Sequence, residues 1–178
     1  MRVKDREFDL FITEEAITSR VQALAQQIDN DYSQESPILV AVLNGAFVFA
    51  ADLARSMGIP AEVTFIKTKS YQQLQSTGQH KEYIGLETSL QDRHVIVVED
   101  IVDSGSTIRY LSQQFAQQNP RSIAIATLLF KPKALSHDIN LDYVGFEIPN
   151  DFVVGYGLDY DGFGRNLRSI YTLASSSE

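Results

Sequence analysis

Short apolar runs typical of buried strands alternate along the chain with segments of helical periodicity. The strand-like runs occupy residues 38–43, 63–67, 94–98, 123–130 and 143–147, with a further stretch around 152–154. In the segment after Thr13, apolar residues recur every three or four positions, at Ile17, Val21, Leu24 and Ile28. This alternation predicts an α/β fold, with a mainly parallel, twisted sheet flanked by helices, as one domain over residues 1–178.

Three helices are expected from their end signals. Thr13 is a candidate N-cap for the first, because two glutamates follow it and the apolar periodicity begins there. The second helix should run from about Phe47 and end at Gly58, since a left-handed glycine commonly terminates helices. The third should follow Thr107 and end at Asn119–Pro120.

The strand at 94–98 leads into the most informative stretch of the sequence. We expect it to end at Glu99 and Asp100, followed by a turn of small residues, 104–107, that opens onto a helix. In open α/β sheets, ligands bind outside the carboxyl ends of the strands. The turn can direct backbone N–H groups and hydroxyls at one anion, and the helix N-terminus favours negative charge. The pattern therefore predicts a phosphate site without a lysine.

The two carboxylates need a different partner, because like charges would repel a phosphate. A vicinal diol or a hydrated Mg²⁺ suits them, since Mg²⁺ prefers carboxylate oxygen. A phosphorylated ribose that carries a metal-bound phosphate group at C1 meets all of these demands. An acidic strand end before an ordinary N-capped turn is the structural alternative for such a stretch.

Composition narrows the classes of partner. The 178 residues include 15 Lys and Arg against 23 Asp and Glu, a net charge of −8, which argues against binding to nucleic acid. There is no cysteine, which excludes disulfides and thiolate zinc sites. No apolar run reaches the roughly 20 residues of a membrane span, and residues 1–7 lack the apolar core of a signal peptide. We therefore expect a cytoplasmic protein that does not bind membranes.

The thirteen residues from Val95 to Thr107 resemble the phosphoribosyl-pyrophosphate signature of type I phosphoribosyltransferases. From about Phe8 to about Leu173, the chain resembles the hypoxanthine (hypoxanthine–guanine) phosphoribosyltransferases of that class. The resemblance implies transfer of phosphoribose from 5-phosphoribosyl 1-pyrophosphate to a 6-oxopurine, with Mg²⁺ as cofactor and pyrophosphate as the second product. It also implies a small hood, built from the N- and C-terminal segments over the strand ends, and a homo-oligomer, either a dimer or a tetramer.

Site residues are implied by the same resemblance. The 5′-phosphate would bind to Asp103, Ser104, Gly105, Ser106 and Thr107. Pyrophosphate would bind to Leu43, Asn44, Gly45 and Arg165, although the family more often carries a basic residue at the position of Asn44. Glu99 and Asp100 would hold the ribose hydroxyls and, together with Asp159, Mg²⁺. Ser70 and Tyr71 would begin a polar lid over the site.

The purine site is implied in the same way, by Ile101, Lys131, Phe152, Val153 and Asp159. Lys131 would donate to O6 of the base and so select 6-oxo over 6-amino purines, because an ammonium cannot accept a hydrogen bond. Phe152 would stack on the ring, and Val153 would offer its backbone to the ring edge. Asp103 would act as general base toward N7–H.

Three alternatives remain at this point. One is a phosphoribosyltransferase for xanthine or another base. Another is a phosphoribosyl-pyrophosphate-sensing regulator that binds nucleic acid, which the net charge of −8 disfavours. The last is a nucleotide-binding module without catalysis, which could have lost Asp103, Lys131 and Asp159, yet all three are present.

Overall fold

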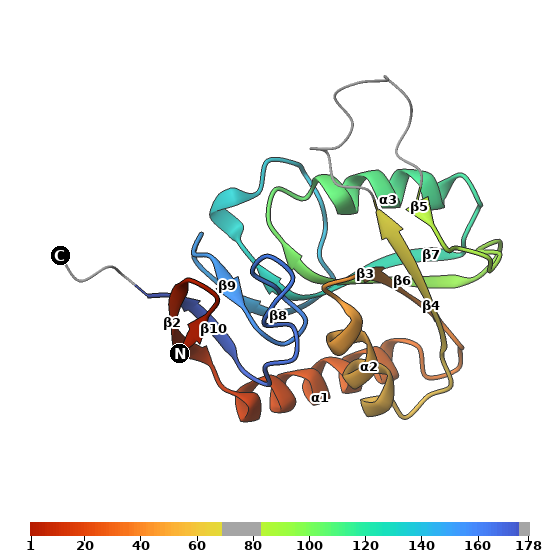
Figure 1. Ribbon diagram of the computed structural model, residues 1–178. Helices are drawn as coiled ribbons and strands as arrows, with labels where there is room; N and C mark the ends of the chain where they lie inside the picture. The colour runs from red at the N-terminus through yellow and green to blue at the C-terminus, as the bar shows by residue number, and fades with distance from the viewer. Residues whose placement is uncertain (69–82, 175–178) are drawn as a thin grey trace, which may run out of the picture.

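A six-stranded sheet forms the centre of the molecule (Figure 1). The structure is a computed structural model and describes residues 1–68 and 83–174. The strand order is β5–β4–β3–β6–β7–β8, and the strands are β3 (Ile38–Leu43), β4 (Glu62–Thr68), β5 (Tyr83–Ile84), β6 (His94–Val102), β7 (Ser122–Phe130) and β8 (Tyr143–Glu147). All pairs are parallel except β4–β5. The predicted mainly parallel sheet is confirmed.

Helices cover both faces of this sheet, which explains why its strands are apolar on both sides. Helices α1 (Glu14–Asp31) and α2 (Phe47–Ser56) lie on one face, and α3 (Ser106–Ala116) lies on the other (Figure 1). Residues of β3 alternate between the two layers: Leu39 packs in the cluster under α1 and α2, and Val40 in the cluster under α3. Thr13 caps α1, with its hydroxyl accepting from the N–H of Ala16 at 3.3 Å, as predicted.

A second, antiparallel sheet forms the expected hood. Its order is β1–β2–β10–β9, and its strands are β1 (Arg2–Val3), β2 (Arg6–Ile12), β10 (Ile170–Leu173) and β9 (Val153–Val154). Chain segments more than 150 residues apart meet here, since Leu173 pairs with Phe8 and Ile170 with Ile12. The stretch around residues 152–154 therefore belongs to the hood rather than to the central sheet.

The end of β6 corrects one prediction. The strand does not end at Glu99 and Asp100 but continues to Val102, because its ladder with β7 extends through the pairs Glu99–Thr127 and Val102–Phe130. Glu99 and Asp100 thus lie within the strand rather than at its end. Helix α3 then begins at Ser106, so Ser106 and Thr107 form its first turn.

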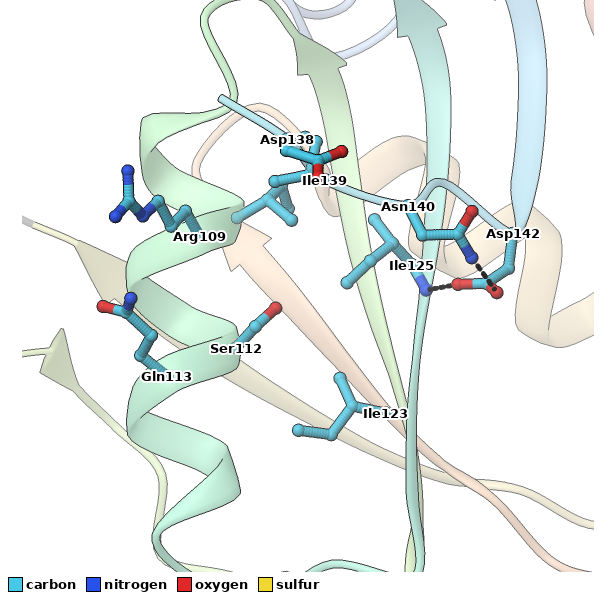
Figure 2. A pocket seen from close by; sticks show the side chains of 10 residues that line it. Arg109, Ser112, Gln113, Ile123, Ile125, Asp138, Ile139, Asn140 and Asp142 are labelled. Atoms are coloured by element: carbon cyan, nitrogen blue, oxygen red, sulfur yellow. Dashed lines mark hydrogen bonds between the residues drawn. The ribbon is translucent and has the colours of Figure 1, made fainter. Parts of the chain in front are cut away.

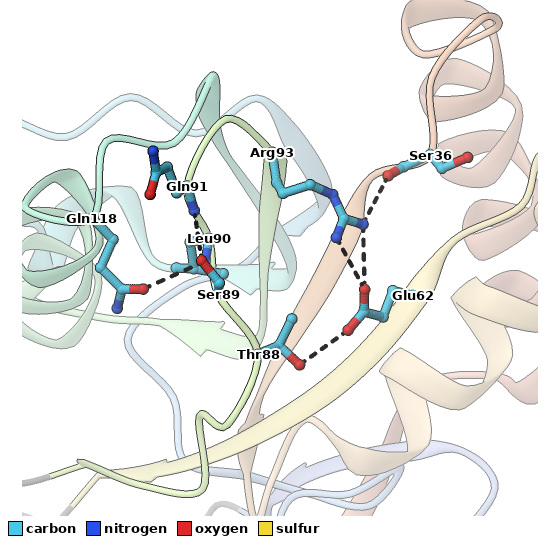
Figure 3. Close-up of polar contacts among 8 residues, drawn as sticks. All are labelled: Ser36, Glu62, Thr88, Ser89, Leu90, Gln91, Arg93 and Gln118. Carbon is cyan, nitrogen blue, oxygen red and sulfur yellow. Dashed lines mark hydrogen bonds and ion pairs between the residues drawn. The ribbon is translucent and has the colours of Figure 1, made fainter.

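The opposite end of the sheet is fastened by a polar network (Figure 3). The carboxylate of Glu62, at the start of β4, accepts from Arg93 Nη1 at 3.2 Å and from Thr88 Oγ1 at 3.0 Å. Arg93 Nη2 also lies 3.5 Å from the carbonyl of Ser36 (Figure 3). These contacts connect the segments that precede β3, β4 and β6 and leave the carboxyl ends of the strands free for a site. Within residues 1–68 and 83–174, no helix is both long and apolar enough to cross a membrane.

Candidate active site

A pair of carboxylic acids, Glu99 buried and Asp100 half-buried, lies near the end of β6. Glu99 is 7% exposed, and its Oε2 atom has no hydrogen-bond partner among the described residues. Asp100 Oδ1 accepts from the N–H of Ile101 at 2.8 Å. Burial raises the pKa of Glu99, and the neighbouring carboxylate of Asp100 raises that pKa further; burial likewise raises the pKa of Asp100. A buried carboxylate without a partner is unfavourable, and a cation would relieve it.

The loop after β3 lies against this pair. A Cβ atom on Gly45 would lie 1.5 Å from Asp100 Oδ2, so only glycine permits so close an approach. The Leu43–Asn44 peptide bond is cis. Gly157, from the hood side, approaches the same loop, because a Cβ atom there would lie 2.1 Å from the carbonyl oxygen of Gly45. The predicted pyrophosphate loop and the predicted metal carboxylates are therefore neighbours.

Arg165 brings a positive charge toward the same region. Its Nη1 donates to the carbonyl of Gly157 at 2.7 Å, and its charge partly offsets the raised pKa of Asp100. Its Nη2 lies 2.6 Å from Asp159 Oδ1, while Asp159 Oδ2 accepts from the N–H of Gly162 at 2.6 Å. Both carboxylate oxygens of Asp159 are thus engaged within the loop that carries Arg165.

The three carboxylates predicted as magnesium ligands do not form one cluster. Among the described residues, no group of three or more His, Cys, Asp or Glu side chains is arranged to hold a metal. Magnesium does not need such a cage, because it usually takes one or two carboxylates and completes its shell with water and substrate phosphates. Glu99, with its unpartnered oxygen, and Asp100 fit that requirement.

The turn of residues 104–107 at the N-terminus of α3, here called the cradle, encloses a small cavity of about 90 Å³. Glu99 and residues 101–108 line this cavity. Gly105 adopts a left-handed φ of 80° and precedes the first helical residue. Ser104 Oγ lies 3.0 Å from Ser106 Oγ and accepts from the N–H of Ser106 at 3.4 Å. Ser104, Ser106 and the first residues of α3 therefore line a space of the size of one small anion at a helix N-terminus.

Lys131 and Asp103 form a pair at the ends of β6 and β7. Lys131 is 9% exposed, and its Nζ lies 3.8 Å from Asp103 Oδ2, whose side chain is 59% exposed. The backbone N–H of Lys131 donates to the carbonyl of Val102 at 2.9 Å, which fixes where the side chain starts. A buried ammonium group thus lies beside an accessible carboxylate, so that a hydrogen-bond donor and a hydrogen-bond acceptor are next to each other.

Phe152 is an exposed aromatic on the hood. Its side chain is 46% exposed, and its ring meets Tyr160 edge-on at a centroid distance of 5.9 Å. The ring of Phe8 packs against it at a tilt, with a centroid distance of 6.3 Å. The adjacent Val153 is buried, and Ile101 is half-buried near the end of β6. Phe152 therefore presents a supported ring that a planar ligand could cover.

Two predicted residues, Ser70 and Tyr71, lie outside the described residues. Conversely, sequence reasoning missed two side chains near the cavity at the start of α3. His137 contacts the cradle, because its Nε2 atom lies 3.0 Å from Ser106 Oγ. Arg109 contacts His137 in turn, with Nη1 3.0 Å from His137 Nδ1. A lone histidine on a loop, 31 residues from Ser106, carries no pattern from which that contact could be foreseen.

Comparison with known proteins agrees with this geometry. Residues 12–161 match the model of the phosphoribosyl transferase domain family, a span that includes the carboxylate pair, the cradle and the Lys131–Asp103 pair. The chain therefore belongs to the phosphoribosyltransferase family.

Relatives within that family point to one kind of phosphoribosyltransferase. The chain is 43% identical to a hypoxanthine-guanine phosphoribosyltransferase of Mycobacterium tuberculosis over 171 residues, 92% of this chain and 85% of the relative. It is 41% identical to that of Bacillus subtilis over 165 residues, 92% of each chain. A crystal structure of a hypoxanthine-guanine phosphoribosyltransferase from Bacillus anthracis superposes with a TM-score of 0.87 at 37% identity, covering 96% of this chain and 99% of that one. Within the family, the chain belongs with the hypoxanthine-guanine phosphoribosyltransferases.

Proposed function

We propose that this protein transfers the 5-phosphoribosyl group of 5-phosphoribosyl 1-pyrophosphate to N9 of hypoxanthine or guanine. In this reaction the bond from C1 to the pyrophosphate oxygen breaks, the bond from C1 to N9 forms, and the base loses one proton. The observation that carries the proposal is the convergence, at one edge of the sheet, of an acid pair with an unpartnered Glu99 oxygen, an anion-sized cradle and the Lys131–Asp103 pair. Relatives of this name over 92% of the chain support it.

Glu99 and Asp100 are the residues that would hold Mg²⁺, because they are adjacent carboxylates and the buried Glu99 has an oxygen without a partner among the described residues. A bound Mg²⁺ neutralises the charge that develops on the leaving pyrophosphate. The loop of Asn44 and Gly45, next to Asp100, and the guanidinium of Arg165 would bind the pyrophosphate oxygens. Asp159 would act here mainly by orienting Arg165, to which it is paired at 2.6 Å.

The 5′-phosphate would enter the cavity at the start of α3. There, N–H groups of the first helical turn and the hydroxyls of Ser104 and Ser106 can donate to its oxygens. Anchoring this end of the sugar positions C1 at a fixed distance from the carboxylate pair. Positioning and electrostatic stabilisation can then supply most of the acceleration, with no covalent enzyme intermediate.

The base would lie between Phe152 and the Lys131–Asp103 pair. The ammonium of Lys131 would donate to O6, and the exposed carboxylate of Asp103 would accept the proton from N7 as N9 attacks C1. Because Lys131 can only donate, a 6-amino group would leave it without an acceptor. This arrangement explains a preference for 6-oxopurines.

The direct test is nucleotide formation from each base with phosphoribosyl pyrophosphate and Mg²⁺. We expect product from hypoxanthine and guanine and little from adenine, with no product after chelation by EDTA. An E99Q/D100N variant keeps the side-chain volume but loses both negative charges, so it should form no product even when Mg²⁺ is present. Xanthine as the preferred base would replace the proposal with its nearest alternative.

We also infer a homo-oligomer. Val63 and Phe65 point outward from β4 with 40% and 43% exposure, and Phe47 on α2 is 42% exposed, so apolar side chains remain uncovered near one edge of the sheet. Light scattering on wild type and on an F65D variant tests this inference, and a monomeric wild type would contradict it. The cytoplasmic location and the absence of nucleic-acid and membrane partners remain predictions.

A further inference from the structure

A histidine outside the signature motif is bound to the phosphate cradle. His137 lies after the short 3₁₀ helix η2 (Pro132–Ala134), on the segment that connects β7 to β8. Its Nε2 atom lies 3.0 Å from Ser106 Oγ, and its Nδ1 atom lies 3.0 Å from Arg109 Nη1, one turn further along α3. Both ring nitrogens are therefore engaged, one by the cradle and the other by a cation.

The identity of the second partner determines how the ring is protonated. A guanidinium can only donate, so Nδ1 must accept, and the imidazole proton must be on Nε2. Nε2–H then donates to Ser106 Oγ, and the hydroxyl hydrogen of Ser106 is left to point elsewhere. It can reach Ser104 Oγ at 3.0 Å or an oxygen of an anion in the cavity.

The segment that carries His137 is also fixed to the cradle through its backbone. Both the N–H and the hydroxyl of Ser136 lie 3.2 Å from the carbonyl of Ser104. Beyond His137, Asp138 and Ile139 line a cavity of about 380 Å³ together with Arg109 (Figure 2), and a Cβ atom on Gly105 would lie 2.8 Å from Ile139 Cδ1. His137 thus lies on a segment that contacts the cradle on both sides of it, through Ser136 and Ile139, and its ring reaches Ser106 and Arg109 of α3.

We propose that His137 is a positioning residue for the 5′-phosphate. This role rests on the function proposed above. His137 orients the hydroxyl of Ser106 as a hydrogen-bond donor to the phosphate, and Arg109 holds the imidazole ring in place. The pair also places a guanidinium near a cradle that contains no lysine, in a chain with a net charge of −8. This residue selects for the phosphorylated sugar rather than for the base.

The test compares two ligands that differ only in that phosphate, inosine 5′-monophosphate and inosine. Their dissociation constants, measured by titration calorimetry, give a phosphate preference for each variant. In H137A we expect the nucleotide to bind about 5- to 10-fold more weakly and inosine to bind unchanged, because about one charge-assisted hydrogen bond is lost. The KM for phosphoribosyl pyrophosphate should rise by a similar factor, with kcat changed less than about twofold.

Three further variants separate positioning from support of the fold. H137Q can place an amide N–H near the position of Nε2–H and should recover most of the preference. S106A should lose at least as much as H137A, and the double variant should lose no more than S106A alone, because one change removes the Ser106 donor and the other removes only the group that orients it. K133A removes an exposed cation from the same segment and should behave as wild type.

An unchanged phosphate preference in both H137A and H137Q would overturn the inference. Equal weakening of nucleotide and inosine binding would also overturn it, because it would mean that His137 only supports the fold. A wild-type protein that forms no nucleotide and does not prefer the phosphorylated ligand would instead refute the proposed function itself. The two failures are therefore distinguishable.

Discussion

Glu99 is a carboxylic acid buried from water, with 7% of its surface exposed. Its pKa is raised above the ordinary value of 4.5 by burial and by the charge of Asp100. The folded protein therefore retains a proton that the unfolded chain has lost once the pH exceeds that value, and the free energy of unfolding falls as the pH rises toward the folded pKa.

Glu99→Gln should remove this dependence. In metal-free protein, we expect the stability of wild type relative to E99Q to decline with rising pH, by up to about 1.4 kcal/mol per pH unit. Urea unfolding in EDTA between pH 5 and pH 8 measures the two slopes. Parallel slopes would show that the Glu99 carboxylate is not penalised by burial. Adding Mg²⁺ should flatten the slope of wild type and leave that of E99Q unchanged.

Asp103 offers a clearer separation of chemistry from binding. Its side chain is 59% exposed, so Asp103→Asn should barely change stability. As the proposed acceptor of the N7 proton, its loss should lower turnover by about 10²-fold or more, while the dissociation constant of phosphoribosyl pyrophosphate changes less than about threefold. Single-turnover kinetics with equilibrium binding of the substrate checks this. Unchanged turnover would exclude Asp103 as the base.

Lys131 should determine which base is accepted. Lys131→Ala removes the donor to O6, and we expect the ratio of kcat/KM for hypoxanthine over adenine to fall at least about tenfold. Lys133→Ala, two positions along the chain and fully on the surface, is the matched control. If K131A still discriminates between the two bases, the 6-oxo group is recognised elsewhere.

At the scale of elements, the loop between β3 and α2 is the tightest contact in the site. Gly45→Ala would place a methyl group 1.5 Å from Asp100 Oδ2 and 2.4 Å from its Cγ, so the Asp100 carboxyl group would have to rotate out of its place beside Glu99. We expect a loss of activity of about 10²-fold or more and weaker Mg²⁺ binding, with the fold retained. Gly58→Ala is a fair control, because its nearest neighbour would be 3.2 Å away, and it should keep its activity. An active G45A would mean that Asp100 can leave the site without consequence.

The elements also show what could be predicted from the sequence. Strands that are buried on both faces, such as β3 and β6, have continuous apolar runs, and their parallel order follows from the helices between them. The hood strands lack this signal: β2 buries Phe8 and Ile12 but exposes Leu10, and its partner β10 lies more than 150 residues away. The extension of β6 to Val102 depends on pairing with β7. The sequence does not indicate this extension, because the acidic residues 99 and 100 interrupt the apolar pattern of the strand.

The same division holds for the candidate site. Residues grouped in one motif, from Glu99 to Thr107, could be identified because a strand, a turn and a helix start occur in immediate succession. The contact of His137 with Ser106 depends on how the segment after β7 folds back on α3, which no local pattern encodes. Likewise, the pairing of Asp159 with Arg165 separates Asp159 from the buried carboxylates, a result of loop geometry alone.

At the scale of the whole molecule, the site lies between two sheets that are joined by few polar contacts. The hydroxyl of Tyr156 donates to Asp52 on α2 at 2.7 Å, and Ser169 Oγ accepts from the N–H of Glu14 at 3.0 Å. The site residues are divided in the same way: Phe152 comes from the hood, while Glu99 and Asp103 come from the central sheet. A ligand that contacts both parts should therefore stabilise the fold as a unit.

Phosphoribosyl pyrophosphate with Mg²⁺ should raise the melting temperature substantially. At a concentration 100 times its dissociation constant, a ligand adds about 2.7 kcal/mol, which for a domain of this size corresponds to roughly 5–11 °C. Mg²⁺ alone should give a smaller rise, because it contacts only the central sheet, and E99Q/D100N should lose the part that depends on the metal. Differential scanning calorimetry separates these contributions. If the substrate raised the melting temperature equally with and without Mg²⁺, the buried carboxylates would have no part in holding the pyrophosphate, and their unpartnered burial would need another cause.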